Sequence, residues 1–476
     1  MVKSNTPIID NLFKHLNNKR INFHVPGHKQ GINIPKKLKN NLLKFDMTEL
    51  SDLDNLHSPE SIIYDSMELT SKTFKSDKSY FLINGTTVGI HAAIMSVCNP
   101  CEKIIIQRDC HKSVIGGILL AGAVPRYIIP SFEDFFSIPG SVNPNDIKEL
   151  LSKEPDIKAV IVSNPNYYGI CSNLKEIQKI VHSFGKILIV DEAHGSHFIF
   201  NNQLPISAME VGADISIQSA HKTLPALTQS SFLHIREKYI DKDKLEYYLN
   251  ILQTTSPSYL LMSFLEFSRN YMELKGTQKL SKIISNVSNL KNNLSTTTKF
   301  SILENTYYDK TRIVLNSRSI GITGFKISEI LEKKYNIWPE MSDLFNVVFI
   351  SSISNKFKDF NKLRKALINI SKNTNIENID FHNLNFNLKN VFSNFNIKIP
   401  ISEIKYKEGI YIDFSNSENQ INFNIITPYP PGIPLINPGE IITKNKLLYI
   451  KTVLMANGHI TGLKNNNLIK VVKNNT

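Results

Sequence analysis

The chain has 476 residues, of which 41% are hydrophobic, and a formal net charge of +13. This length suits two or three domains, and no apolar run approaches the about 20 residues of a membrane-spanning helix. The N-terminus has no apolar run followed by a small-residue cleavage site, so we expect a cytoplasmic protein that does not bind membranes. The lysines lie largely among asparagines and isoleucines, and no basic run is interleaved with aromatic residues, which argues against a nucleic-acid partner.

Four cysteines in so long a chain argue against a disulfide scaffold. Cys98 and Cys101 form a CxxC pair, which cannot complete a zinc site alone and only weakly indicates a redox site. We interpret both as small buried residues at a helix end and expect no metal site.

Short β-branched runs alternate with amphipathic helical stretches between about residues 60 and 240. The predicted strands are 79–83, 103–107, 126–129, 158–163, 186–190, 213–217 and 230–235. Most are continuously apolar, which is typical of strands buried on both faces. This alternation predicts an α/β fold with a doubly wound, mostly parallel sheet, whose ligands bind beyond the carboxyl ends of the strands.

Later segments predict smaller α+β domains. Residues 311–316 and 346–351 resemble strands, and residues 325–337 and 360–373 resemble helices. Residues 372–400 are polar and irregular, which is typical of a linker. The predicted organisation is an N-terminal arm (1–57), a large domain (58–280), a small α+β domain (281–375) and a C-terminal domain (376–476).

Polar residues follow two of the first predicted strands. Gly85, Thr86 and Thr87 precede a helical run, where hydroxyl groups and free N–H groups can bind an anion such as phosphate. His111 falls at another strand-to-helix turn, where its ring could lie flat against a planar cofactor. Alone, the Gly-Thr-Thr motif is better explained as a plain helix N-cap, and alone, His111 is explained about equally well as a helix cap or as a ring stacked on a cofactor.

Asp191 ends a predicted buried strand, within the sequence DEAHG. A carboxylate buried there needs a cation, and a protonated pyridine nitrogen would serve. The small Ala193 would leave room for a ring. The same letters occur in helicase-like boxes, but those require a P-loop, and the chain has no GxxxxGK[ST] sequence.

Lys222 follows the next predicted strand, within SAHKT. Desolvation at such a position lowers the pKa of a lysine and makes it a competent imine-forming amine. Ser219 and His221 flank it and could bind a phosphate. A lone lysine after a strand is common, but Asp191 and Lys222 lie 31 positions apart, about one strand–helix–strand crossover. Four weak motifs directed at one crevice together indicate a cofactor site.

These motifs resemble fold-type I enzymes that use pyridoxal 5′-phosphate (PLP), and among them the bacterial-type Orn/Lys/Arg decarboxylases. The resemblance covers nearly the whole chain. It includes HVPGHKQG (24–31), DLDNLH (52–57), the HKS, DEAHG and SxHK motifs, YPPGIP (429–434) and PGE (438–440). A small departure is Asp109, where relatives tend to have asparagine.

The resemblance implies how the cofactor is held. Lys222 would carry it as a Schiff base, Asp191 would pair with the ring nitrogen, and His111 would stack on the ring. The residues implied to hold the phosphate are Thr86, Thr87, Ser219 and His221. Lys222 or His194 would return the proton to the substrate.

Other implied residues lie outside this core. Thr255 and Ser256 resemble a segment that a neighbouring subunit supplies, so the minimum assembly is a homodimer. Glu440 would meet the cationic tail of the substrate near the entrance. Because HVPGHKQG begins at residue 24, we expect the receiver-like N-terminal domain of longer members to be absent, which puts their higher-order rings in doubt.

The implied reaction is decarboxylation of arginine, lysine or ornithine in polyamine biosynthesis, and shorter family members favour arginine. One alternative is another fold-type I reaction, transamination or aldolase-type cleavage. Aminotransferases commonly bind the substrate carboxylate with a late arginine, and Arg364 is the last arginine here. The other alternative is an inactive relative that regulates a partner.

Overall fold

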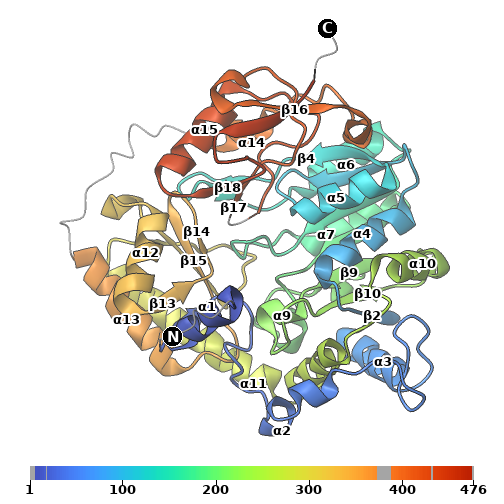
Figure 1. Cartoon of the computed structure of the whole chain (residues 1–476), viewed down its shortest axis with the longest axis vertical. Helices are drawn as coiled ribbons and strands as arrows, with labels where there is room; N and C mark the ends of the chain where they lie inside the picture. The colour runs from blue at the N-terminus through green and yellow to red at the C-terminus, as the bar shows by residue number, and fades with distance from the viewer. Residues whose placement is uncertain (1–5, 18, 373–387, 430–431, 474–476) are drawn as a thin grey trace.

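The computed structural model describes residues 6–17, 19–372, 388–429 and 432–473. In Figure 1 a large domain built on a central sheet lies on the right, a smaller sheet domain on the left, and the C-terminal part at the top. The predicted α/β class and the smaller following domains are confirmed.

The central sheet has seven strands in the order β2-β10-β9-β8-β7-β3-β4. All seven predicted strands are found within two residues of their predicted limits. The strands are β2 (Lys78–Leu82), β3 (Lys103–Gln107), β4 (Val124–Ile128), β7 (Ala159–Ser163), β8 (Ile187–Asp191), β9 (Ile215–Gln218) and β10 (Ser231–Ile235). β10 alone runs opposite to the other six strands, so the carboxyl ends of those six share one edge of the sheet.

The strands of this sheet are continuously apolar, and their side chains are buried on both faces of the sheet. In β3, for example, Ile104 and Ile106 enter one apolar cluster and Ile105 enters another. The first cluster includes side chains of α4 (Gly85–Val97), α5 (Lys112–Ala121) and α10 (Lys242–Leu252). The second includes side chains of α6 (Pro144–Lys153), α7 (Leu174–Ser183) and α8 (Ala208–Val211). Two layers of helices therefore enclose the sheet and leave its carboxyl edge for ligands.

The remaining elements of the large domain are short or lie at its border. They are α3 (Ile62–Phe74), β5 (Phe132–Glu133), β6 (Ile138–Pro139), η2 (Phe198–Phe200) and α9 (Ala220–Thr223). α11 (Tyr259–Thr297) then continues without a break through residue 280, the expected end of the large domain, and leads into the small domain.

The small domain contains a four-stranded sheet in the order β11-β12-β15-β14, which packs against α11, α12 and α13. Its elements are β11 (Ser301–Ile302), β12 (Arg312–Asn316), η3 (Arg318–Ile320), α12 (Gly324–Tyr335), β13 (Ile337–Pro339), β14 (Met341–Ser342), β15 (Asn346–Ile350) and α13 (Phe357–Lys372).

The N-terminal segment is tied to the small domain. It contains α1 (Pro7–Leu16), β1 (Ile21–Phe23), α2 (Lys36–Lys39) and η1 (Leu42–Phe45). β1 pairs in parallel with β13, so the predicted arm supplies a strand to a domain more than 300 residues later in the chain.

The C-terminal part has its own apolar cluster around α15. Its elements are α14 (Leu388–Ser393), η5 (Ile401–Tyr406), β16 (Gly409–Asp413), η6 (Phe414–Asn416), β17 (Thr427–Tyr429), α15 (Lys444–Met455), β18 (His459–Thr461) and β19 (Leu468–Val472). Residues 373–387 of the predicted linker, and Pro430 and Pro431 of the proline-rich motif, lie outside the described residues.

Two further observations bear on the sequence analysis. Among the described residues, no helix has the length and apolar character that crossing a membrane requires. All four cysteines are unpaired, and Cys98 is a buried C-cap of α4 as expected. Cys101 is exposed, so its predicted burial is wrong.

Candidate active site

A cavity of about 730 Å³ lies at the carboxyl edge of the central sheet. It is lined by every predicted residue that follows a strand of that sheet. These residues are Thr86, Thr87, His111, Asp191, Ala193, His194, Ser219, His221 and Lys222. The parallel strands therefore bring together motifs that are scattered over 137 positions of the chain.

Lys222 lies on α9, the single helical turn that follows β9 directly. Burial lowers the pKa of Lys222, while the carboxylates of Asp191 and Glu340 oppose this effect. The lysine is therefore closer to its uncharged, nucleophilic form than an exposed lysine.

The HVPGHKQG motif packs against this turn. The N–H of Gly27 donates to the carbonyl of His221 at 2.7 Å. A Cβ at Gly27 would lie 2.4 Å from the carbonyl oxygen of Leu224, so only glycine permits this approach. The N-terminal motif therefore helps to hold Lys222 in place.

Asp191 is the last residue of β8, and it is 6% exposed. Its carboxylate accepts a hydrogen bond from the N–H of Ala193 at 3.2 Å and has no ion-pair partner among the residues that the structure describes. Burial raises the pKa of Asp191. A buried carboxyl group without a cation is the arrangement expected where a protonated ring nitrogen binds.

Asp191 needs a cation, whereas a nearby cluster of hydroxyl groups could bind an anion. The hydroxyl group of buried Thr86, in the first turn of α4, is 2.5 Å from that of buried Ser219, the N-cap of α9, and Thr87 beside Thr86 is exposed. His221 contacts the carbonyl of Ser230 through Nδ1 at 2.9 Å, so its ring can offer a second N–H to a phosphate only when it is protonated.

His111 caps α5 and accepts the N–H of Ser113 at Nδ1. Burial lowers the pKa of His111 to about 3, so the ring is uncharged at neutral pH. An uncharged aromatic ring in the cavity can stack on a planar cofactor. Together with Lys222, Asp191 and the hydroxyl cluster, it makes a set of groups that fits PLP.

Three predicted site residues lie outside this cavity. Thr255 and Ser256 are exposed in the loop between α10 and α11. Glu440 is completely buried, and its Oε2 is 2.9 Å from Lys446 Nζ and 3.2 Å from Arg108 Nη2. The expected place of Glu440 near the entrance is therefore wrong, because two buried cations already occupy its carboxylate.

Several cavity residues escaped the sequence analysis. Tyr167 follows β7, and its ring centroid is 5.2 Å from that of His194, so inspection of this strand end would have found it. Glu332, Trp338 and Glu340 come from the small domain, and no motif marked them. Glu340 is anchored by the N–H of Val25 at 2.8 Å.

The comparisons with known proteins identify the family of the chain. Residues 6–317 match the family model "Orn/Lys/Arg decarboxylase, major domain", and residues 401–467 match its C-terminal domain. The arginine decarboxylase of Bacillus subtilis is 32% identical over 99% of both chains. That of Halalkalibacterium halodurans is 32% identical over 94% of this chain and 93% of its own.

Solved structures show the same fold. The lysine decarboxylase of Francisella novicida superposes with a TM-score of 0.79, covering 97% of this chain and 80% of its own, at 21% identity. Because the two family models together match most of the chain and a relative 32% identical matches nearly all of it, the chain belongs to the Orn/Lys/Arg decarboxylase family and is a PLP-dependent carboxy-lyase that acts on basic amino acids.

Proposed function

We propose that the chain converts arginine into agmatine and CO₂, with lysine as the nearest alternative substrate and ornithine as the third. The supporting observation is one cavity that contains Lys222 and Asp191 and also two carboxylates from the small domain. Two of the relatives that align over nearly the whole chain are named arginine decarboxylases, which favours arginine. The product suggests a place in polyamine biosynthesis.

The two small-domain carboxylates suit a cationic substrate. Glu332 and Glu340 are only partly buried, and neither has an ion-pair partner within the described ranges. Trp338 lies between them in sequence and also lines the cavity, but the guanidinium group of Arg20 already lies 4.2 Å from its ring centroid, so the two carboxylates are the groups offered to a cationic tail. These residues replace Glu440 as the groups that would meet the substrate tail.

The bound cofactor supplies an electron sink for the pair of electrons that the departing carboxylate leaves behind. The chain would hold it through Lys222 at the aldehyde, Asp191 at the ring nitrogen and His111 against the ring. Thr86, Thr87, Ser219 and His221 would hold the phosphate, and Ala193 would leave room for the ring. An ionised Asp191 would keep a proton on the ring nitrogen, which is electrostatic preorganisation.

A proton must return to the substrate Cα after CO₂ has left. Lys222 Nζ and His194 Nε2 are 3.1 Å apart in the cavity, so either can deliver it. We also propose a cytoplasmic homodimer, or a larger homo-oligomer, in which exposed Thr255 and Ser256 complete the phosphate site of the neighbouring subunit.

The test compares CO₂ release from arginine, lysine and ornithine at equal concentrations, with Lys222→Ala as the control. We expect arginine to have the highest kcat/KM and the control to release no CO₂. Keto-acid formation without CO₂ would instead support transamination. Wild-type protein that retains no chromophore and releases no CO₂ would support an inactive relative.

A further inference from the structure

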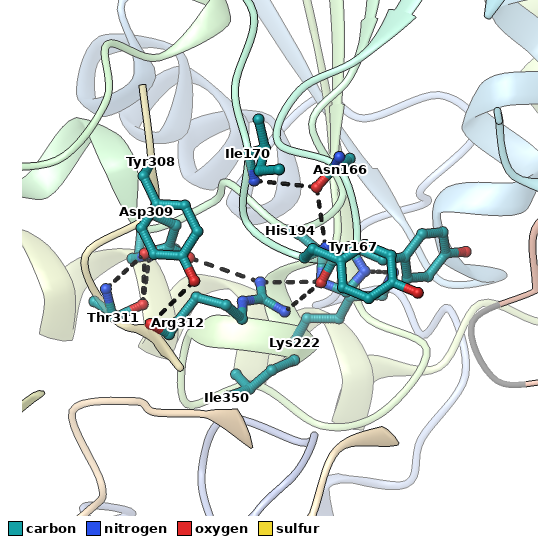
Figure 2. A network of polar contacts seen from close by, with 12 residues as sticks. Asn166, Tyr167, Ile170, His194, Lys222, Tyr308, Asp309, Thr311, Arg312 and Ile350 are labelled. Carbon is teal, nitrogen blue, oxygen red and sulfur yellow. Dashed lines mark hydrogen bonds and ion pairs between the residues drawn. The ribbon is translucent and has the colours of Figure 1, made fainter. Parts of the chain in front are cut away.

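A row of buried polar side chains runs from the cavity into the small domain (Figure 2). Lys222 Nζ lies 3.1 Å from His194 Nε2, and His194 Nδ1 lies 3.4 Å from Arg312 Nη2. Arg312 Nη2 is also 3.6 Å from Asp309 Oδ2. Arg312 lies on β12, so the row joins the turn that carries Lys222 to the small-domain sheet.

The guanidinium group of Arg312 is held from several sides. It is 1% exposed, and Nη1 donates to the carbonyl of Tyr167 at 3.3 Å. Asp309 is itself fixed, because its Oδ1 accepts the N–H and hydroxyl of Thr311 at 2.9 and 2.7 Å. His197 Nε2 contacts the same oxygen at 3.2 Å. Arg312 therefore cannot turn away from His194 without breaking buried polar contacts.

This geometry determines where the proton of His194 lies. A guanidinium group has only hydrogen-bond donors, so His194 Nδ1 must be the acceptor. In an uncharged imidazole the single proton is then on Nε2. That N–H points at Lys222 Nζ, which can accept it only as an uncharged amine.

The surroundings of His194 and Lys222 favour the uncharged form of both side chains. Burial lowers the pKa of His194 well below its ordinary value, and the positive charge of Arg312 lowers it further. Burial also lowers the pKa of Lys222, which Asp191 and Glu340 raise and Arg312 lowers. An ammonium group on Lys222 would instead need a histidine with its proton on Nδ1, directed at a guanidinium group.

We propose that Arg312 is a positioning residue that fixes the proton of His194 on Nε2 and thereby presents Lys222 as an uncharged amine. Arg312 itself does not line the cavity, so it acts through His194. The inference rests on the proposed attachment of the cofactor to Lys222, and it adds a reason why that amine is ready to react at neutral pH.

The first test follows cofactor uptake by the full chain after the cofactor has been removed. The rate of PLP uptake is measured by absorbance from pH 6 to 10 in wild type, Arg312→Gln, Arg312→Lys and Arg318→Gln. Arg318 is a matched control because it is a small-domain arginine that packs on Phe345, away from the cavity. Borohydride trapping and peptide mapping confirm which lysine reacts.

We expect the midpoint of the pH profile to rise by about one unit in Arg312→Gln, so that uptake at pH 7 slows about tenfold. Arg312→Lys keeps a cationic donor and should recover most of the wild-type profile, and Arg318→Gln should match wild type. A folded Arg312→Gln protein with the wild-type profile would overturn the proposal.

A second measurement needs no Arg312 variant and therefore does not depend on its folding. Histidine ¹⁵N chemical shifts of the cofactor-free wild type distinguish the two ring tautomers, and His194→Gln assigns the signal. We expect the proton on Nε2, and a proton on Nδ1 would refute the proposal. If borohydride instead labels another lysine in wild type, the proposed function fails separately from this inference.

Discussion

Asp191 is the proposed partner of the ring nitrogen. The substitution Asp191→Asn should have one effect on the stability of the cofactor-free protein and another on the stability of the cofactor complex. In the free protein the carboxyl group is buried and unpaired, and its pKa is raised. A raised pKa in the folded state means that folding stability is lost as the pH rises through that pKa. At pH 7.5, Asp191→Asn should therefore leave the cofactor-free protein as stable as wild type or more stable.

The cofactor complex should respond in the opposite direction. Breaking a buried, hydrogen-bonded ion pair by removing one partner costs about 3–5 kcal/mol. Since 1.4 kcal/mol corresponds to a factor of ten, the Kd for PLP should rise about a hundredfold to a few thousandfold. The stabilisation that saturating PLP gives to wild type should shrink correspondingly.

Two assays measure these opposite effects on the cofactor-free protein and on the PLP complex. Thermal unfolding with and without PLP gives the stability of each form, and titration of the cofactor-free protein gives the Kd. If Asp191→Asn binds PLP within threefold of wild type, or if it destabilises the cofactor-free protein by several kcal/mol, the assignment of Asp191 to the ring nitrogen is refuted.

Three further substitutions test the packing around the site. Glu440→Gln leaves two buried cations without their carboxylate, so urea unfolding should show a loss of about 3–5 kcal/mol while KM for arginine changes little. Burial raises the pKa of Asp109 from 3.8 to about 6, so its stability contribution is lost as the pH rises through about 6. Asp109→Asn should therefore stabilise the protein by at most about 3 kcal/mol at pH 8, and by less at pH 5. Gly27→Ala would force a Cβ against Leu224 and should cost about 1–3 kcal/mol, with slower PLP uptake.

Each substitution also has an outcome that would contradict its reasoning. A tenfold higher KM for folded Glu440→Gln would show that this carboxylate reaches the substrate after all. A gain for Asp109→Asn that is larger at pH 5 than at pH 8 would mean that Asp109 is not a destabilising buried acid. An unchanged Gly27→Ala protein would show that the N-terminal motif does not hold the Lys222 turn.

The central sheet could be predicted because its strands are continuous apolar runs separated by helices, and burial on both faces demands such runs. The position of Lys222 and Asp191 followed from one rule, that parallel strands direct their carboxyl ends to a common edge. The reversed direction of β10 could not be predicted, because strand direction leaves no mark in an apolar run.

The other failures have a common physical cause. Glu340 and Arg312 reach the site from the small domain, and nothing in their local sequence indicates which distant strand they will face. The place of Glu440 came from the resemblance alone, and the sequence did not indicate that Arg108 and Lys446 would enclose it. Residues that reach a site from another domain can be identified only from the three-dimensional structure.

The central claim is that one cavity holds one cofactor between Asp191 and Lys222, and borohydride reduction of the purified protein tests it most directly. Lys29 is the informative competitor, because burial lowers its pKa to about 7 although it does not line the cavity. After digestion and mass spectrometry, the account predicts the reduced cofactor on the peptide that contains Lys222. Its appearance on Lys29 or any other lysine, with Lys222 unmodified, would contradict the account.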